Sequence, residues 1–544
     1  MVTISIIIFF LTNIQLVYSA EVNSPEIGAV QNYSYGKDEY YRMKNGQNPS
    51  QESPIIDSND TKQQEKQEES DITVLIKKIE IDQSEILSSV DLQAITSKYE
   101  NRKLSIKELK DLVEEINQLY AQKKITTAKA ILPPQKIING IVQIRLIEAH
   151  VGEVRIEDNK FTRSSYFYNR INLASGDLVN LNDLEEELIY FNRTNDVQVR
   201  LELQPGSKAG TTDCILRVLE PDRERYVIFT DNGGNKTNGI YRRGLTMVNN
   251  SLSKRRDSLS ITGIWSEGNT AGSASYELPI NNRGTRLGVF YSKNQSTIIS
   301  GPFESLDISG DVSDLALTLN NPLTVSPNYK LDNLIELHNK KSSTSFSGTP
   351  LVKTDVHSIN IGFAEQAFSN KSYRYTRHDF ISGKADNSQE VRKFFRYNLS
   401  YVKQSRLFNN NILTLRLAGQ LSNQDLLPSS EQFVIGGMST VRGYPEGLLN
   451  GDQGYFLSAE MSFPFHNSEK AQGFVFLDHG GAFPYKGNNQ GPDSNDFLTS
   501  VGLGANIKFS KVTSGKIVFG LPLSSPKEYD QKLRVHFFLQ TLLN

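Results

Sequence analysis

This chain of 544 residues contains a single cysteine, Cys214. One cysteine excludes an internal disulfide framework and any metal site built from several cysteines. The seven histidines are scattered along the sequence and match no spacing typical of a metal site. We therefore predict that the protein holds no metal, and we interpret Cys214 as a small buried side chain in a strand.

Neither sign of charge dominates the sequence. Lysine and arginine together number 59, and aspartate and glutamate number 61, which gives a net charge of −2. A general nucleic-acid-binding protein usually carries a surplus of basic residues. The balance therefore argues against nucleic acid as a partner.

Long hydrophobic runs are also missing. Hydrophobic residues make up 38% of the chain, and after residue 20 no apolar run approaches the ~18 residues that a membrane-spanning helix needs. This excludes a helical membrane protein. It does not exclude a transmembrane β-barrel, because barrel strands alternate apolar and polar side chains and are hydrophilic on average.

Familiar catalytic motifs are absent as well. The sequence contains no His-Glu-x-x-His motif, no phosphate loop of the Walker type and no Gly-x-Ser-x-Gly elbow. Residues 502–504, Gly-Leu-Gly, lie in an alternating segment, which favours a barrel wall over a cofactor turn. His479 follows Asp478 directly, but neighbouring strand residues face opposite ways and form no catalytic dyad. We predict that the protein is not an enzyme and has no catalytic residue and no cofactor.

The first 71 residues are typical of an export signal followed by a linker. Residues 4–11 are almost wholly apolar, and Val17 and Ser19 suit the −3 and −1 positions of a signal-peptidase site. We predict a signal peptide over residues 1–19, although no Lys or Arg precedes the apolar stretch. Residues 20–71 are too polar to bury much apolar surface, so we predict a disordered linker that could also contain a plug segment.

Residues 72–222 are predicted to form two successive small modules of mixed strands and helices. In the first, residues 72–149, Ser105 and Glu108 form a capping-box signature ahead of an amphipathic helix. In the second, residues 150–222, Asn182 and Glu185 indicate the start of another helix, and alternating strand residues follow it.

Helical periodicity disappears from residue 223 to residue 544. Strand-like segments such as 411–423 carry leucines on one face and Thr, Arg and Gln on the other. This pattern is typical of an outer-membrane barrel, whose apolar face meets lipid and whose polar face meets water. About sixteen such segments can be counted, an even number as in single-chain bacterial barrels. The predicted fold is a transmembrane antiparallel β-barrel of about 16 strands, preceded by two small α+β domains.

Three short motifs in this sequence resemble those of one family. The motif residues are Pro133, Pro134, Gln135 and Gly140, then Val441, Arg442, Gly443 and Tyr444, and last Phe476, Asp478 and Gly480. The first group resembles the junction between two periplasmic POTRA domains. The second resembles the signature tetrapeptide of a loop folded back into a barrel, and the third a Phe-x-Asp-x-Gly motif of the barrel wall. Together they resemble two-partner secretion transporters of the hemolysin-activator type, in the superfamily that also contains the outer-membrane assembly factor.

The resemblance covers roughly residues 72–544 and implies a function in protein secretion. It implies a location in the outer membrane of a Gram-negative bacterium, with the POTRA domains in the periplasm. A large secreted exoprotein, such as an adhesin or a hemolysin, would bind the POTRA domains in an unfolded state and cross the lumen without ATP. Outer-membrane lipid, and the barrel-assembly machinery during biogenesis, are the other partners implied.

Two other functions are compatible with a barrel. Insertion factors for outer-membrane proteins resemble this chain in barrel and loop, but they usually carry three to five POTRA domains, and residues 72–222 have room for two. A passive porin or receptor needs neither POTRA domains nor the loop tetrapeptide. A large exoprotein encoded next to this chain would favour the secretion transporter.

The two barrel motifs also suggest a contact with each other. In a strand over residues 471–480, Val475 and Leu477 would face lipid and Asp478 would face the lumen. Arg442 can bind such a carboxylate with two parallel hydrogen bonds, which lysine cannot do. We predict a lumenal ion pair between Arg442 and Asp478, against the alternative that each side chain only faces water.

Overall fold

The computed structural model describes residues 56–58, 73–123, 125, 127–208, 210–387, 390–424, 426–465, 470–485, 494–526 and 533–543. The predicted signal peptide lies outside the described residues, and so does the predicted linker apart from Ile56–Ser58. The chain divides between Glu220 and Pro221 into two units.

The first unit begins with a small module in which two helices pack on strands. Ser105 and Glu108 form the capping box that starts α4: the Ser105 hydroxyl accepts from the Glu108 backbone N–H, and the Glu108 carboxylate accepts from that of Ser105. Leu112 and Ile116 of α4 are buried in the core. The short helix α3, which the sequence analysis missed, is capped by the side chain of Ser88. The elements are β2 (Thr73–Ile76), β3 (Lys78–Ile81), α3 (Ser89–Thr96), β4 (Arg102–Ser105), α4 (Ile106–Gln122), β5 (Ala128–Ile131) and β6 (Ile141–Glu148).

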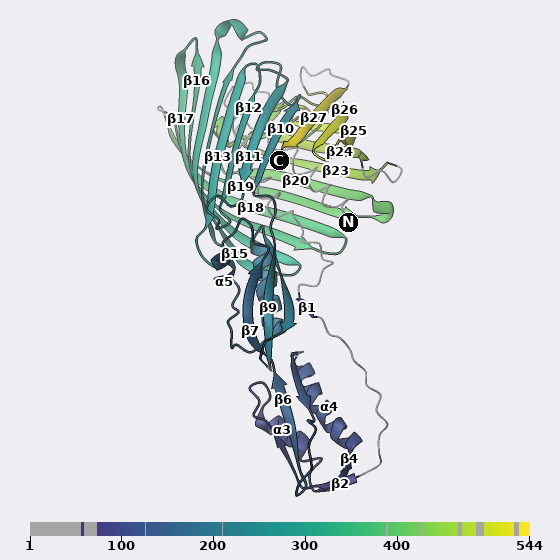
Figure 1. Ribbon diagram of the computed structural model, residues 1–544. Helices are drawn as coiled ribbons and strands as arrows, with labels where there is room; N and C mark the ends of the chain where they lie inside the picture. The colour runs from purple at the N-terminus through teal and green to yellow at the C-terminus, as the bar shows by residue number, and fades with distance from the viewer. Residues whose placement is uncertain are drawn as a thin grey trace. The chain divides into compact units, whose positions relative to one another are not determined.

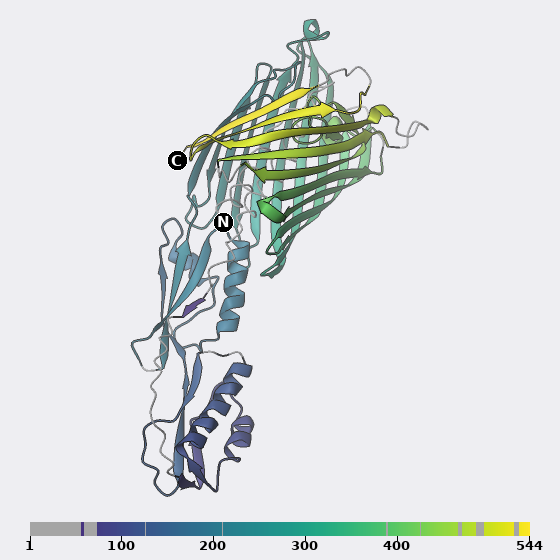
Figure 2. The ribbon, with the colours of Figure 1, turned by 90° about the vertical axis from the view of Figure 1, so that its right-hand side faces the viewer.

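A second module of similar design follows, with α6 beside a sheet of order β1-β8-β9-β7 (Figure 2). Asn180 caps α6 by accepting a hydrogen bond from the Asn182 backbone N–H at 3.1 Å, so the helix begins earlier than predicted. Leu188 and Phe191 of α6 pack into the core. Among the described residues, no helix is long and apolar enough to span a membrane. The elements are β7 (His150–Glu157), α5 (Ser164–Tyr168), α6 (Leu181–Thr194), β8 (Gln198–Pro205) and β9 (Thr211–Leu219).

Part of the predicted linker is a strand. The backbone of β1 (Ile56–Ser58) pairs in parallel with Leu201–Leu203 of β8 and extends the sheet of the second module. The prediction of a disordered linker is therefore wrong for these residues. Composition could not reveal the strand, because an edge strand is held through the backbone of its neighbour rather than by its own apolar side chains.

The residues compared with a junction between POTRA domains lie inside the first module. They are Pro133, Pro134, Gln135 and Gly140, and they belong to the connection between β5 and β6. The Gln135 side chain closes this turn by accepting from the Gln143 backbone N–H at 2.9 Å and donating to the Gln143 carbonyl at 2.7 Å. The Gly140 carbonyl accepts from the backbone N–H of Lys77 at 2.7 Å. The junction assignment is corrected accordingly: the motif shapes a turn, and the two modules meet between β6 and β7.

The second unit is a closed antiparallel barrel of sixteen strands, in which β27 pairs with β10 to complete the ring (Figure 1). This confirms the predicted fold class. In β24, Val475 and Leu477 are 47% and 50% exposed, whereas Phe476 and Asp478 are 5% and 0% exposed. The strands β15 to β18 have 15 to 20 residues, more than the ~9–11 that cross a membrane, so their hairpins project beyond it. The ring consists of β10 (Glu224–Asp231), β11 (Arg242–Asn249), β12 (Ser258–Trp265), β13 (Asn269–Pro279), β14 (Arg286–Thr297), β15 (Ile308–Ser326), β16 (Tyr329–Phe346), β17 (Thr349–Phe368), β18 (Ser372–Asp386), β19 (Val391–Arg406), β20 (Ile412–Ser422), β23 (Gln453–Pro464), β24 (Ala471–Phe483), β25 (Phe497–Lys508), β26 (Thr513–Pro522) and β27 (Arg534–Leu543).

The cysteine offers a test of the second module. Cys214 lies in β9 with no exposed surface, and burial raises the pKa of its thiol to about 11, so little thiolate forms near neutral pH. We expect the folded chain to resist alkylation by iodoacetamide and to take up a single alkyl group after unfolding in urea, as measured by intact mass. Rapid alkylation of the folded protein would contradict the buried placement. Since the chain has no other cysteine, the signal reports on this module alone.

Candidate functional site

The candidate site is the long connection between β20 and β23, residues 423–452, which we call the inner loop. It contains a short helical turn (Ser429–Glu431) and a hairpin formed by β21 (Phe433–Ile435) and β22 (Leu449–Gly451). Every residue from 434 to 447 is buried. A connection of this length on the outside of a barrel would be exposed, so the inner loop lies within the barrel, folded back against the wall.

The tip of the inner loop is fixed by Arg442, which contacts Asp478 of β24. Arg442 Nε donates to Asp478 Oδ2 at 2.7 Å, and Nη2 donates to Oδ1 at 2.9 Å. The backbone N–H of Arg442 donates to the same carboxylate at 3.1 Å. Both side chains are fully buried. Two parallel charge-assisted hydrogen bonds determine the orientation of the tip as well as its position.

Arg442 has a second carboxylate partner, which the sequence analysis did not single out. Its Nη1 pairs with Glu460 of β23, a buried side chain, and its Nη2 donates to Ser458 Oγ at 3.3 Å. The guanidinium also lies over the ring of Phe476, 3.6 Å from the centroid, a favourable cation–π geometry. Alternation along β23 places Glu460 on the lumen face, but only the register, in which Ser458 pairs with Asp478, reveals that the two carboxylates are close.

Gly443 lies where the inner loop touches the wall. Its φ is +95°, a conformation that favours glycine, and an added Cβ would lie 3.0 Å from the carbonyl carbon of Gly520 in β26. Its backbone N–H donates to Nε2 of the buried His536 in β27 at 3.3 Å. Two glycine backbones thus meet at the tip. Neither Gly520 nor His536 belongs to a motif that the sequence analysis identified.

Val441 and Tyr444 complete the contact of the tip with the wall. The Tyr444 hydroxyl lies 2.8 Å from the backbone oxygen of Thr499 and 2.6 Å from that of Ser524, so it bridges the ends of β25 and β26. Val441 and Tyr444 both belong to a buried apolar cluster that includes Leu498 of β25. The tip is therefore held by packing and by neutral hydrogen bonds in addition to the ion pairs.

Gly480 of the wall motif faces the hairpin of the inner loop. An added Cβ there would lie 2.6 Å from the backbone oxygen of Tyr455 and 3.4 Å from Cδ1 of Ile435. The absence of a side chain therefore lets β21 pack closely against β24.

Among the described residues, no group of three His, Cys, Asp or Glu side chains is placed to hold a metal ion. His479 does not contact Asp478; its ring nitrogens lie 2.8 Å from the Tyr455 hydroxyl and 2.8 Å from Thr499 Oγ1. What the geometry can do is hold a loop inside a barrel through noncovalent contacts that can be broken and formed again.

The sequence matches the family model of the haemolysin secretion/activation proteins ShlB/FhaC/HecB over residues 210–507, more than half of the chain. The chain belongs to this family. The model of the ShlB-type POTRA domain matches residues 74–149, so the first module is a POTRA domain. The family predicted from the motifs is thereby confirmed.

Relatives of this family member cover most of its length. The heme/hemopexin transporter protein HuxB of Haemophilus influenzae is 25% identical over 467 residues, which are 81% of each chain. The outer membrane transporter CdiB of Dickeya dadantii is 23% identical over 482 residues, which are 83% of each chain. The solved structure of CdiB from Escherichia coli matches with a TM-score of 0.67 at 20% identity, covering 96% of this chain and 100% of that one. BamA from Haemophilus ducreyi without POTRA domains 1–3 matches with a TM-score of 0.52 at 13% identity, covering 87% and 100%.

This protein is therefore an outer-membrane β-barrel of the two-partner secretion transporter family, and it has periplasmic POTRA domains. The predicted location is confirmed. The likeness to BamA concerns the fold alone, whereas the family model covers most of the barrel. The family consists of transporters rather than enzymes.

Proposed function

We propose that this chain secretes one large partner exoprotein, such as an adhesin or a hemolysin, outward through its barrel without ATP. The observation that carries the proposal is the inner loop. It occupies the lumen, yet its hairpin pairs with itself and takes no part in the ring of sixteen strands. The loop can therefore leave the lumen without breaking a strand pair of the wall, and a polypeptide can take its place.

In our proposal the inner loop is a gate, and the pair of Arg442 and Asp478 is the latch, the contact that holds the gate closed. The closed state is held by the two hydrogen bonds between their side chains and by the pairing of Arg442 with Glu460. When the tip leaves the wall, water enters and hydrates the separated charges, which lowers the cost of opening relative to a dry interior. The latch is strong enough to order the loop and weak enough to be released by a binding event.

The POTRA modules receive the unfolded exoprotein in this proposal. β1 pairs with only three of the eight residues of β8, so it covers less than half of that edge of the sheet. An extended segment of the exoprotein can add to this edge through backbone hydrogen bonds and displace β1. Outer-membrane lipid around the barrel, and the barrel-assembly machinery during biogenesis, are the remaining partners that we propose.

Deleting the gene for this chain tests the proposed function. We expect one large protein to disappear from the culture medium while the other outer-membrane proteins keep their levels, as measured by mass spectrometry of both fractions. A plasmid copy of the chain should restore the missing protein. A general fall in outer-membrane barrels with an unchanged medium would instead identify an insertion factor. A change in small-solute uptake alone would identify a porin or receptor.

The polar segment after β1 should act only as a tether. Exchanging residues 59–70 for a Gly/Ser sequence of the same length should leave barrel assembly and secretion unchanged, because the polar composition of this segment offers few side chains that a core could bury. Heat-modifiable migration of the barrel in gels, together with the amount of secreted exoprotein, measures both. Loss of the folded barrel would contradict the tether interpretation, and loss of secretion with a normal barrel would assign a docking role to the segment.

A further inference from the structure

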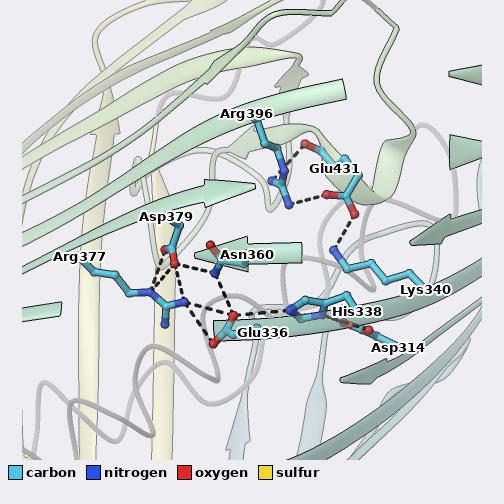
Figure 3. A network of polar contacts seen from close by, with 9 residues as sticks. All are labelled: Asp314, Glu336, His338, Lys340, Asn360, Arg377, Asp379, Arg396 and Glu431. Atoms are coloured by element: carbon cyan, nitrogen blue, oxygen red, sulfur yellow. Dashed lines mark hydrogen bonds and ion pairs between the residues drawn. The ribbon is translucent and has the colours of Figure 1, made fainter. Parts of the chain in front are cut away.

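A second set of buried charges holds the inner loop and involves other strands than those that Arg442 contacts. Glu431 lies in the part of the inner loop that follows β20, and its side chain is fully buried. Lys340 Nζ of β16 donates to Glu431 Oε1 at 2.6 Å, and Arg396 of β19 pairs with the other carboxylate oxygen (Figure 3). One carboxylate thus joins two cations from strands that are not neighbours in the ring.

The backbone at the same point is also fixed. Gln420 of β20 donates from Nε2 to the carbonyl oxygen of Glu431 at 2.8 Å and to that of Asp452 at 3.0 Å. The Asp452 carboxylate accepts from the backbone N–H of Leu427 at 2.8 Å. Because Asp452 ends the inner loop and Leu427 lies near its beginning, these bonds hold the two ends of the loop together beside Glu431.

The wall beside Lys340 carries a polar network of its own, which Figure 3 shows as a group separate from the contacts of Glu431. Glu336, His338 and Lys340 occupy alternate positions of β16 and so share one face of the strand. His338 Nδ1 lies 3.1 Å from Asp314 Oδ2 on β15, and its Nε2 lies 3.5 Å from Glu336 Oε2. Arg377 Nη2 of β18 lies 3.4 Å from the same Glu336 oxygen. These contacts link β15, β16 and β18, so Lys340 projects from a part of the wall that is already held together for the loop.

The two sets of contacts lie on different parts of the ring. In ring order, β16 and β19 precede β20, whereas the strands that hold the tip, β23 to β27, follow it. Glu431 ties the loop to the first part, and Arg442 ties it to the second. The inner loop thus extends across the lumen from one part of the wall to the other, with one anchor near its base and one at its tip.

We propose that Glu431 is a second anchor of the inner loop. It holds the part of the loop that follows β20 against β16 and β19 and keeps the lumen closed independently of Arg442. The inference deepens the proposed function, on which its meaning for secretion rests. Removing one charge of a buried cluster leaves the others uncompensated, which strongly favours the hydrated, detached state. Glu431 acts by positioning the loop, and release of both anchors is required for the full opening of the lumen.

Conductance of the purified full-length chain in planar lipid bilayers tests this proposal without the exoprotein. Glu431→Gln keeps the shape of the side chain and removes its charge, and Lys340→Met removes the partner's charge at similar length. We expect each variant to raise the ratio of open to closed time by about tenfold or more. Glu431→Asp, which keeps the charge, should lie closer to the unmodified chain than Glu431→Gln does.

The matched control is Glu390→Gln, because Glu390 also pairs with an arginine, Arg392, but is exposed in the connection between β18 and β19. It should gate like the unmodified chain. If the anchors are independent, the double variant Arg442→Ala with Glu431→Gln should raise the open-to-closed ratio over the unmodified chain by the product of the two single fold increases.

If Glu431→Gln and Lys340→Met showed the same open-to-closed ratio as Glu390→Gln, the second anchor would be overturned. This holds whatever happens to secretion. Heat-modifiable migration in gels shows that each variant is a folded barrel before it is measured, and either of the two variants alone suffices for the decision. Conversely, a gene deletion that leaves the culture medium unchanged would refute the proposed secretion function and would leave the anchor, measured by conductance, standing. The two failures are therefore distinguishable.

Discussion

Cells that carry Arg442→Ala should insert the barrel at normal levels but export very little of the partner exoprotein. The substitution leaves two buried carboxylates, Asp478 and Glu460, without the cation that they share. Breaking a buried ion pair from one side costs about 3–5 kcal/mol, which is enough to displace the tip of the loop. A detached tip that is still inside the lumen obstructs the path of the exoprotein instead of leaving it in an ordered step. The strand pairs of the ring do not involve Arg442, so the barrel should still assemble. The measurement is the amount of exoprotein in the medium per barrel in the outer membrane.

Arg442→Lys should restore export only weakly, because one ammonium group cannot reproduce two parallel hydrogen bonds to Asp478 while also reaching Glu460. A matched control is Arg374→Ala, which removes an exposed arginine that pairs with Glu365 between β17 and β18. Exposed pairs contribute about 0–1 kcal/mol, so this variant should export normally. Normal export by both Arg442→Ala and Asp478→Ala would show that the ion pair has no role in transport.

A similar defect should follow from a single added methyl group on the wall. A Cβ at Gly520 would lie 2.6 Å from the backbone nitrogen of Gly443 and 2.7 Å from its Cα. Backbone atoms cannot turn aside as a flexible side chain can, and overpacking of this kind typically costs about 1–3 kcal/mol. We therefore expect Gly520→Ala to force the tip away from β26 and to reduce export, with the barrel still folded. Gly443→Ala should act in the same way and adds the strain of a positive φ.

Gly272→Ala is the control for this pair. Gly272 is also a barrel-strand glycine, in β13, but the nearest atom to an added Cβ is the Thr262 carbonyl oxygen at 3.6 Å, an ordinary contact. Export and barrel level should be unchanged in this variant. If Gly520→Ala exported as well as Gly272→Ala, seating of the tip against β26 in the closed state would not be required for export.

The fold was largely predictable because the alternation of strand residues survives in each segment of the barrel. Lipid on one side and water on the other impose a period of two, and the ring closes with the predicted number of strands. The small elements were less accessible. Helix α3 is short, and β1 is held by backbone pairing with β8, so neither leaves a strong hydrophobic period in the sequence.

The candidate site was predictable only in part. Alternation along β24 placed Asp478 on the lumen face, and the loop tetrapeptide supplied Arg442. The remaining partners depend on strand register and on the path of the loop, which no local pattern encodes. Glu460 and His536 are ordinary polar positions of alternating strands, and Glu431 is one charge in a polar connection. Their roles follow from contacts between residues that are distant in sequence.

The docking surface of the tip also sets an order of events in assembly. Asp478, Thr499, Gly520 and His536 lie on β24, β25, β26 and β27, which all follow the inner loop in the chain. The ribosome therefore makes the loop before any part of the surface that receives its tip. A barrel that lacks its last strand has no complete seat for the tip, and its pore has no fully seated lid. Seating of the loop thus marks completion of the ring, and a chain truncated before β27 should leave cells with a leaky outer membrane.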